Sequence, residues 1–259
     1  MLFAFDLDNT LVTRDHVLPA EIARSIAAAR SHGHHVTVLT GRTADSAGAH
    51  LRRLDVSDFY SVNHGALVIG RDGSVLRQAT IKSSTVKSLI ERYEAVPRLE
   101  YSCVVGNTIY VREPDDERWN WAHTSGQRIE HVAMFNGDPA DKVVFHCPES
   151  GDRIRCEIAA GHPDLQLYHW DNHFLEVTGV GAHKGAALKL IAETLGVPRS
   201  DTVAFGDGIN DVTMLEWAGH GVAVGPYAYP QVLDAADEHI ASPEDLGVAA
   251  WLENNVLRI

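Results

Sequence analysis

Short apolar runs alternate with amphipathic stretches over the first part of the chain. Residues 2–5 (LFAF) are apolar throughout, which is typical of a strand buried on both faces of a parallel sheet. The pattern predicts strands at residues 2–5, 36–39 and 59–63, separated by helices at residues 18–33 and 43–54. Strict alternation of strand and helix predicts a parallel sheet with helices packed on its faces.

This alternation then breaks and returns near the end of the chain. Residues 66–78 predict a hairpin, because the turn dipeptide Asp72-Gly73 separates two apolar runs. Residues 81–171 mix helices and strands without alternation, which is typical of an inserted domain with an antiparallel sheet. We therefore predict two domains, a core of residues 1–80 and 172–259 and an insertion of residues 81–171.

Two aspartates, Asp6 and Asp8, follow the first predicted strand two positions apart. Residues at i and i+2 point to the same face of a strand, so the two carboxylates converge. Burying like charges together costs several kcal/mol unless a group of opposite charge lies between them. This pair of acids therefore predicts a bound cation.

Polar residues also end two further predicted strands. Thr40, Gly41 and Arg42 follow the second strand, and Asp207 and Asp211 follow the later apolar run TVAF. In open parallel sheets, ligands bind in the crevice outside the carboxyl ends of the strands. Three such strand ends, together with a lysine at position 184 that opens a helix, predict one ligand site at this edge of the sheet.

The overall charge and the cysteine content narrow the class of protein. A net charge of −13 and a pI near 5.5 argue against a nucleic-acid partner, which normally requires a basic face. The sequence shows neither a basic leader followed by an apolar run nor a long apolar stretch, so neither export nor a membrane partner is predicted. Cys103, Cys147 and Cys156 lack CxxC spacing, which favours reduced thiols and a cytoplasmic location. The sequence does not predict the oligomeric state.

Four segments resemble, in order, the four motifs of the haloacid dehalogenase (HAD) superfamily. They are DLDNT (6–10), LTGR (39–42), Lys184 in GAHKGAAL, and GDGINDVTML (206–215). The large insertion and the GDGIND segment resemble the Cof-type branch, which has a type IIB cap. The resemblance covers the whole chain and implies an α/β fold, with a Rossmann-like doubly wound parallel-sheet core and an inserted α/β cap domain. Most members of the superfamily are magnesium-dependent phosphatases, so Mg²⁺ is the implied cofactor.

The resemblance implies roles for the four aspartates. Asp6 is the implied nucleophile and a metal ligand, and Asp8 the general acid/base that also binds the metal through its backbone carbonyl. Asp207 is the implied second carboxylate ligand, and Asp211 orients metal-bound water or supports the ligands. Mg²⁺ suits such a site because it takes oxygen ligands in octahedral geometry, commonly one or two carboxylates plus waters and a phosphate oxygen.

The other motif residues are implied to bind phosphate. Thr40 and the backbone N–H of Gly41 hold phosphate oxygens, while Asn210 donates to the phosphate or toward the cap. Lys184 stabilises negative charge on the nucleophile and on the phosphoryl group. Arg42 either reaches the substrate or pairs with a local acid, and both interpretations stay open.

Each motif also has an ordinary structural interpretation. Thr40 alone could cap a helix, Lys184 could be an exposed lysine, and Asp8 could be a loop acid. The GDGIND segment could be a tight turn, but all four together favour the catalytic interpretation. The family pattern is broken at NHGA (63–66), which has an extra histidine, and at VGPYAYP (224–230). Both departures bear on the substrate more than on the chemistry.

The predicted function is hydrolysis of small phosphorylated metabolites, with sugar phosphates as the expected class, through an aspartyl-phosphate intermediate. A phosphomutase of the related type IIB branch and a non-catalytic metabolite-binding protein are the alternatives. The histidine cluster at positions 32, 34 and 35 is predicted to be a solvated turn. Aromatic and polar residues of the insertion are predicted to select the substrate, namely Arg118, Trp119, Trp121, Arg153, His169, Trp170, Asn172 and His173.

Overall fold

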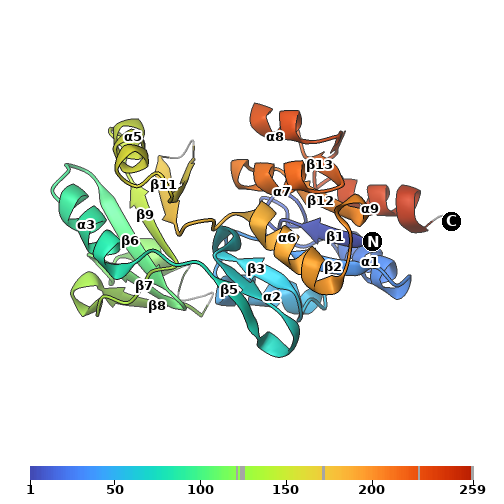
Figure 1. Cartoon of the computed structure of the whole chain (residues 1–259), viewed down its shortest axis with the longest axis horizontal. Coiled ribbons are helices and arrows are strands. Elements are labelled where there is room, and N and C mark those ends of the chain that lie inside the picture. Colours follow the sequence, from blue (N-terminus) through green and yellow to red (C-terminus); the bar gives the residue numbers. More distant parts are fainter. Residues whose placement is uncertain (121, 123–125, 171–172, 227, 258–259) are drawn as a thin grey trace. The chain divides into compact units, whose positions relative to one another are not determined.

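The computed structural model describes residues 1–120, 122, 126–170, 173–226 and 228–257 (Figure 1). By their internal contacts these residues form two compact units. The first unit comprises Met1–Gly41, Ala47–Arg77 and His183–Ile259, and the second comprises Arg42–Ser46 and Gln78–Ala182. None of the helices in the described part of the chain is both long and apolar enough to cross a bilayer.

The first unit is built on a five-stranded sheet in the order β14-β13-β12-β1-β2. Every neighbouring pair in this sheet is parallel, as the alternation of apolar and amphipathic segments predicted. β1 lies between β12 and β2, so Phe5 is paired with Phe205 on one side and Val38 on the other. The strands are β1 (Leu2–Phe5), β2 (His35–Val38), β12 (Thr202–Gly206), β13 (His220–Val224) and β14 (Glu238–Ile240).

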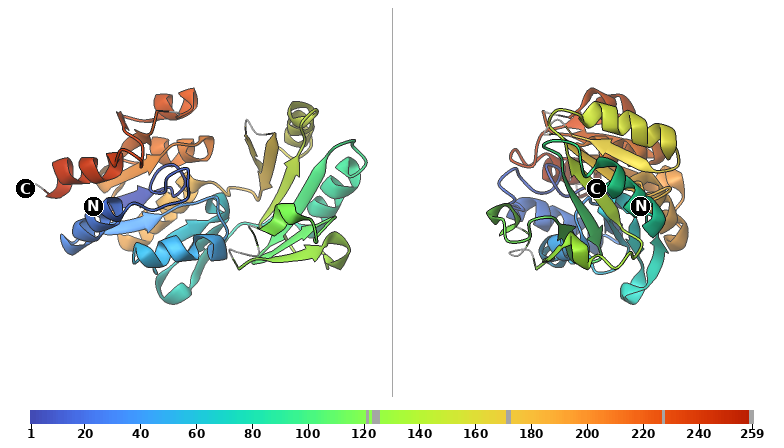
Figure 2. Two further views of the ribbon diagram at one scale, coloured as in Figure 1. Left: turned by 180° about the vertical axis from the view of Figure 1, so that it is seen from behind. Right: turned by 90° about the vertical axis from the view of Figure 1, so that its left-hand side faces the viewer.

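Helices cover both faces of this sheet (Figures 1 and 2). Successive side chains of β1 point to opposite faces and therefore enter different cores. Phe3 and Phe5 pack with α1 (Ala20–Ser31), α2 (Ala44–Arg53) and α9 (Gly247–Leu252). Leu2 and Ala4 pack with α6 (Lys184–Leu195), α7 (Val212–Trp217) and α8 (Pro230–Ala235). The predicted doubly wound α/β core is therefore confirmed.

The third predicted strand lies in a separate sheet. β3 (Tyr60–Val62), β4 (Leu67–Ile69) and β5 (Val75–Gln78) form a three-stranded sheet, and β3 reaches the main sheet through a parallel bridge between Leu39 and Ser61. The predicted turn is found between β4 and β5, where Asp72 and Gly73 both have positive φ.

The second unit is a six-stranded sheet in the order β10-β11-β9-β6-β7-β8. Its neighbours are antiparallel except β7 and β8. α3 (Ser83–Tyr93) and α5 (Gly151–Gly161) pack on one core with residues of β6, β9 and β11. The strands are β6 (Glu100–Val105), β7 (Thr108–Val111), β8 (Arg128–His131), β9 (Lys142–His146), β10 (Gln166–His169) and β11 (Phe174–Thr178).

The boundaries of the second unit differ from the predicted insertion. β11 pairs with β9 and β10, so the unit extends to Ala182 rather than to residue 171. The predicted boundary placed β11 in the core. A buried antiparallel strand and a buried parallel strand have the same short apolar pattern, so the pattern does not distinguish them. It remains a prediction that the core carries the catalytic groups and the insertion selects the substrate.

Short 3₁₀ helices connect several of these elements, and a π-helical turn, Glu253–Leu257, follows α9. The 3₁₀ helices are Asn63–Gly65 (η1), Arg71–Gly73 (η2), Glu117–Trp119 (η3), Val132–Met134 (η4), Arg199–Asp201 (η5) and Ile209–Asp211 (η6).

Candidate active site

Three adjacent parallel strands of the first unit end in predicted site residues. Asp6 follows β1 directly, Asp207 follows β12, and Thr40 lies just beyond β2. The backbone N–H of Asp6 donates to the carbonyl of Phe205 at 2.9 Å, which continues the β1–β12 pairing past the end of β1. The strand order thus places these residues at one edge of the sheet.

Lys184, the first residue of α6, is completely buried beside two of the acids. Its Nζ donates to Oδ1 of Asp6 and to Oδ1 of Asp211, each at 2.5 Å. Burial alone would lower the pKa of Lys184, but the carboxylates of Asp211 and Asp6 outweigh burial and raise this pKa. Lys184 is therefore a buried ammonium group, and the interpretation as an exposed lysine is wrong.

The carboxylate of Asp211 is engaged at both oxygens. Oδ1 accepts from Lys184, and Oδ2 accepts from the backbone N–H groups of Asp207 (3.0 Å) and Gly208 (2.9 Å). A Cβ atom at Gly206 would lie 2.5 Å from Cγ of Asp211, so only glycine fits there. Asp211 thus fixes both the lysine and the backbone that carries Asp207.

Asp6, Asp207 and Asp211 each contribute a carboxylate oxygen to a group whose members lie within 4.8 Å of one another. Burial raises the pKa of Asp6 well above its usual range; Lys184 opposes this, while Asp211, Asp207 and Asp8 add to it. Burial and Asp211 likewise raise the pKa of Asp207 to about 7. One ammonium group is too little positive charge for these acids, and a hard divalent cation with oxygen ligands fits the donor set.

The DLDNT motif contributes more than its two acids. Thr10 donates from its hydroxyl to Oδ1 of Asp207 at 3.3 Å, and a hydrogen bond from the Asn9 side chain lowers the pKa of the same aspartate. The sequence assigned neither residue a role. Asp8 is half-buried, and its Oδ1 lies 3.8 Å from Nδ1 of His16. The three-carboxylate group does not include the side chain of Asp8.

The residues predicted to bind phosphate form a second connected group. Thr40 is buried, and its carbonyl accepts the backbone N–H of His64 at 3.0 Å. The His64 ring lies against Gly41 and approaches the amide of Asn210, which is also buried. Because Asn210 immediately precedes Asp211, this group is continuous with the acids. The sequence singled out His64 only as a departure from the family pattern.

Arg42 contacts the start of α2. It belongs to the second unit, where its Nη1 donates to the carbonyl of Ser46 at 3.5 Å. Whether Arg42 reaches the substrate or pairs with a local acid remains a prediction.

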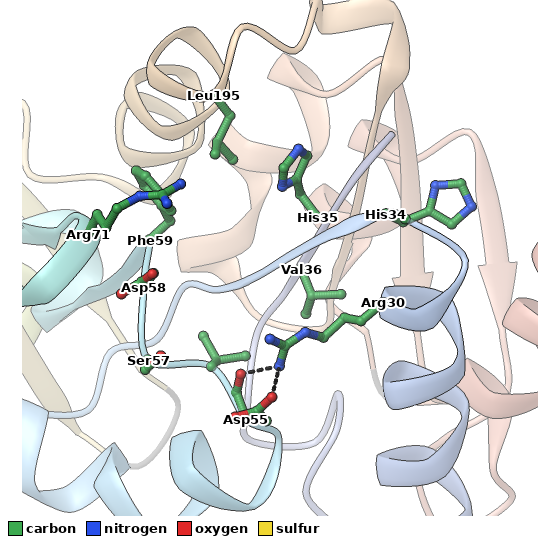
Figure 3. Close-up of a pocket in the computed structure, with 12 residues that line it drawn as sticks. Arg30, His34, His35, Val36, Asp55, Ser57, Asp58, Phe59, Arg71 and Leu195 are labelled. Carbon is green, nitrogen blue, oxygen red and sulfur yellow. Dashed lines mark hydrogen bonds and ion pairs between the residues drawn. The ribbon is translucent and has the colours of Figure 1, made fainter.

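A cavity of about 330 Å³ opens at the other edge of the main sheet, where β2 begins (Figure 3). His34, His35, Arg71 and an ion pair between Arg30 and Asp55 (3.0 Å) line it, and none of the predicted site residues does. Figure 3 shows His34 and His35 pointing in different directions. Since the acids lie beyond the opposite ends of the strands, this cavity is distinct from the candidate site.

Comparison with known proteins gives a consistent result over nearly the whole chain. A family model described as haloacid dehalogenase-like hydrolase matches residues 3–252. The chain is 28% identical to the 5-amino-6-(5-phospho-D-ribitylamino)uracil phosphatase YitU of Bacillus subtilis (strain 168), over 97% of this chain and 96% of the relative. It is 25% identical to the phosphatase YwpJ of the same organism, over 98% of this chain and 99% of the relative.

Solved structures share the fold. A haloacid dehalogenase-like hydrolase from B. subtilis superposes with a TM-score of 0.85 at 23% identity, over 98% of this chain and 99% of that one. The structure of the HAD subclass IIB sugar phosphatase BT4131 superposes with a TM-score of 0.82 at 22% identity, over 98% of both chains.

Proposed function

The chain belongs to the haloacid dehalogenase-like hydrolases, and we propose that it is a magnesium-dependent phosphatase of small phosphorylated metabolites. The single observation that carries this proposal is the buried Lys184 held at 2.5 Å from both Asp6 and Asp211, beside Asp207. A binding protein has no need of a strand-end carboxylate that is buried and paired in this way. The proposal includes a Cof-type assignment, with the second unit as a type IIB cap.

In the proposed reaction, Asp6 is the nucleophile. Lys184 occupies its Oδ1, which leaves Oδ2 to attack phosphorus. A bond forms between Asp6 and phosphorus while the bond to the leaving oxygen breaks, and Asp8 gives that oxygen a proton. Asp8 then takes a proton from the water that hydrolyses the aspartyl-phosphate. The half-buried position of Asp8 suits a group that must exchange protons with solvent.

Mg²⁺, when bound, would neutralise charge on the phosphoryl oxygens. Asp6, Asp207 and the backbone carbonyl of Asp8 would hold it. Asp211 would act indirectly, because its own carboxylate oxygens already accept from Lys184 and from two backbone N–H groups. Thr40, Gly41 and Asn210 would bind the phosphate oxygens.

The names of similar proteins support a substrate with a polyol or sugar-sized group. One relative is named for a phosphoribitylamino-uracil substrate, and one structure with the same fold is described as a sugar phosphatase. Sugar-sized groups are recognised by aromatic faces and by hydrogen-bonding side chains, and the second unit contains both. We extend the proposal to phosphate esters of sugars or similar polyols.

The test is phosphate release from a panel of phosphorylated metabolites, with Asp6→Asn as the control for contaminating phosphatases. Release is expected with Mg²⁺, loss in chelator, and poor support by Ca²⁺, whose larger and looser coordination shell spoils the geometry. Full activity in chelator would contradict the metal requirement. Conversion of one phosphorylated isomer into another, without release of phosphate, would identify a phosphomutase instead. Binding without either outcome would identify a non-catalytic protein.

A further inference from the structure

The turn that follows β3 has an uncommon backbone. Asn63, His64 and Gly65 have φ values of 50°, 58° and 97°, so three successive residues are in the left-handed region. A Cβ at Gly65 would lie 2.5 Å from the backbone oxygen of His183, the residue before Lys184. His64 is buried at 2% exposure, although histidine is often at least partly exposed. Backbone strain of this kind is retained where neighbouring contacts hold the residue in place.

Contacts of its side chain hold His64 in place. A Cβ at Gly41 would lie only 2.3 Å from Cε1 of the imidazole, so the ring rests on the Cα of Gly41. Nδ1 of the same ring lies 3.1 Å from Nδ2 of Asn210. All of these residues belong to the first unit. One imidazole therefore joins the loop after β2 to η6, the two segments that supply the proposed phosphate ligands.

The chemistry of this contact fixes its direction. An amide nitrogen only donates, so Nδ1 of His64 accepts, and the proton of the neutral ring is on Nε2. With one amide hydrogen held by His64, the plane of the Asn210 amide is set, and its second hydrogen has a defined direction. Without an acceptor at Nδ1, the buried Asn210 amide would lose this orientation.

We propose that His64, with its ring held against Gly41, is a positioning residue that orients the Asn210 amide for phosphate binding. This inference rests on the proposed function, because it assigns Asn210 and Gly41 to the phosphate. The competing explanation is that His64 merely fills space beneath the turn. The two explanations differ in whether the effect of a His64 substitution depends on Asn210.

The matched pair of variants is His64→Asn and His64→Leu. Asparagine tolerates a positive φ and can place a side-chain oxygen acceptor near the site of Nδ1, whereas leucine has similar bulk but no acceptor. His64→Leu should raise KM, and the inhibition constant of inorganic phosphate, by about tenfold, since a buried donor loses its partner. The kcat value should change little, because ground-state binding is affected as much as the transition state. His64→Asn should restore most of the lost binding.

A double-mutant cycle with Asn210→Ala supplies the decisive readout. If His64 acts through Asn210, His64→Leu should add little to the loss already caused by Asn210→Ala. Additive losses, or a His64→Asn protein as impaired as His64→Leu, would overturn the proposal. Thermal unfolding of each variant is measured alongside, so that a protein that fails to fold is recognised.

An NMR measurement separates this inference from the proposed function. The ¹⁵N signals of the His64 ring, assigned by their absence in His64→Asn, should show an unprotonated Nδ1 that shifts in Asn210→Ala. A protonated Nδ1, or no shift, would overturn the contact in a protein without substrate. If no phosphate ester is hydrolysed but the shift is seen, the proposed function fails and the His64–Asn210 contact stands. If the enzyme is active and the cycle is additive, only the role of His64 fails.

Discussion

Lys184 is a charged residue inside the protein, so its neighbours must balance its charge. It is fully buried, and it is the ammonium group between Asp6 and Asp211. Removing it leaves buried carboxylates without a cation, whereas removing one carboxylate relieves repulsion among those that remain. Substitutions on the two sides of this ion pair should therefore affect stability differently.

We expect Asp6→Asn to abolish turnover, by at least about 10³-fold, because the attacking carboxylate is lost. Its free energy of unfolding in chelator should change by less than about 1 kcal/mol, since the amide oxygen still accepts from Lys184. Lys184→Met should instead lower the free energy of unfolding by about 3–5 kcal/mol. Urea unfolding and phosphate release measure both effects. Near-normal turnover of Asp6→Asn would contradict its role as the nucleophile.

The three thiols differ in surroundings, which predicts their reactivity. Burial, aided by Asp141, raises the pKa of Cys103 to about 12, and burial also raises the pKa of Cys147. Cys156 is exposed on α5. At pH 8 a disulfide reagent should label Cys156 rapidly and the other two only on unfolding. Cys156→Ser should abolish the rapid phase, and a rapid phase that persists in that variant would contradict the prediction.

At the scale of elements, local pattern predicted the strands and helices of the first unit well, because each carries its own period. It did not predict that β3 pairs with β4 in a separate sheet. The left-handed turn at residues 63–65, which joins these two strands, has no apolar period to reveal it. The local pattern also missed α8 and β14, which span only Pro230–Ala235 and Glu238–Ile240. Elements this short give too few residues for a period to be recognised.

Site residues at strand ends could be predicted because a parallel sheet dictates where its strands end. The contact between His64 and Asn210 could not, because it joins residues 146 positions apart through a turn of unusual backbone. The hydrogen bonds from Thr10 to Asp207, and from the backbone N–H groups of Asp207 and Gly208 to the Asp211 carboxylate, depend in the same way on tertiary geometry. The sequence thus pointed to groups that the structure brings together, but not to Thr10 and His64, which contact them.

The start of α6 provides a pH-dependent prediction. Nδ1 of His183 accepts the N–H of Ala186 at 3.2 Å and caps the helix that begins with Lys184. Burial and Arg77 lower the pKa of His183. Because this pKa is lower in the folded protein, His183 binds a proton more readily in the unfolded chain. The stabilisation that the neutral His183 cap contributes is therefore present above about pH 6.5 and is lost as the pH falls below it.

We expect the free energy of unfolding to fall more between pH 7.5 and pH 5.5 in the wild type than in His183→Asn. Asparagine caps a helix equally well and does not titrate. The difference should stay below about 1 kcal/mol, because His183 is only half-buried and solvent screens it. Urea unfolding at the two pH values measures it, and equal losses in both proteins would contradict the role of His183.

At the scale of the whole molecule, each unit has a core of its own. The second unit buries Val86, Leu89, Phe145 and Ile154 among α3, α5 and its sheet. Leu175 and Val177 of β11 enter this core, so Glu176 between them points to the other face of the sheet. The second unit thus has a helix-covered face and a separate face that carries polar and aromatic groups.

The residues predicted to select the substrate fall into different surroundings in the second unit. Trp119 packs against a small cluster around Val104 and Ile109 and donates to the carbonyl of Glu113, so it has a structural role. Arg153 pairs with Glu157 on α5. His169 lies 3.4 Å from Asp152, and the His173 carbonyl accepts the N–H of Cys147. Trp121, Asn172 and the side chain of Arg118 lie outside the described residues.

Among the members of this set that the structure describes, Trp170 is the one best placed to contact a polyol. Its Nε1 donates to Glu176 at 3.2 Å, its ring stacks on Tyr168 at 6.4 Å, and Glu176 pairs with Lys142 at 2.8 Å. An aromatic face beside a carboxylate and an ammonium group offers stacking together with hydrogen bonds to hydroxyl groups. These contacts lie on the face of the sheet that carries Glu176, away from α5.

We therefore expect Trp170→Ala to lower kcat/KM for the preferred sugar-sized phosphate by about tenfold while leaving hydrolysis of a small aryl phosphate within about twofold. The matched control is Arg155→Ala, which removes an exposed ion pair with Asp152 from α5 and should change neither activity, since such pairs contribute little. Steady-state kinetics with both substrates measure the ratio of the two kcat/KM values. The small aryl phosphate is the reference, because both substrates carry the same phosphoryl group. Equal losses on both substrates in a folded Trp170→Ala protein would show that this face of the second unit does not select the substrate.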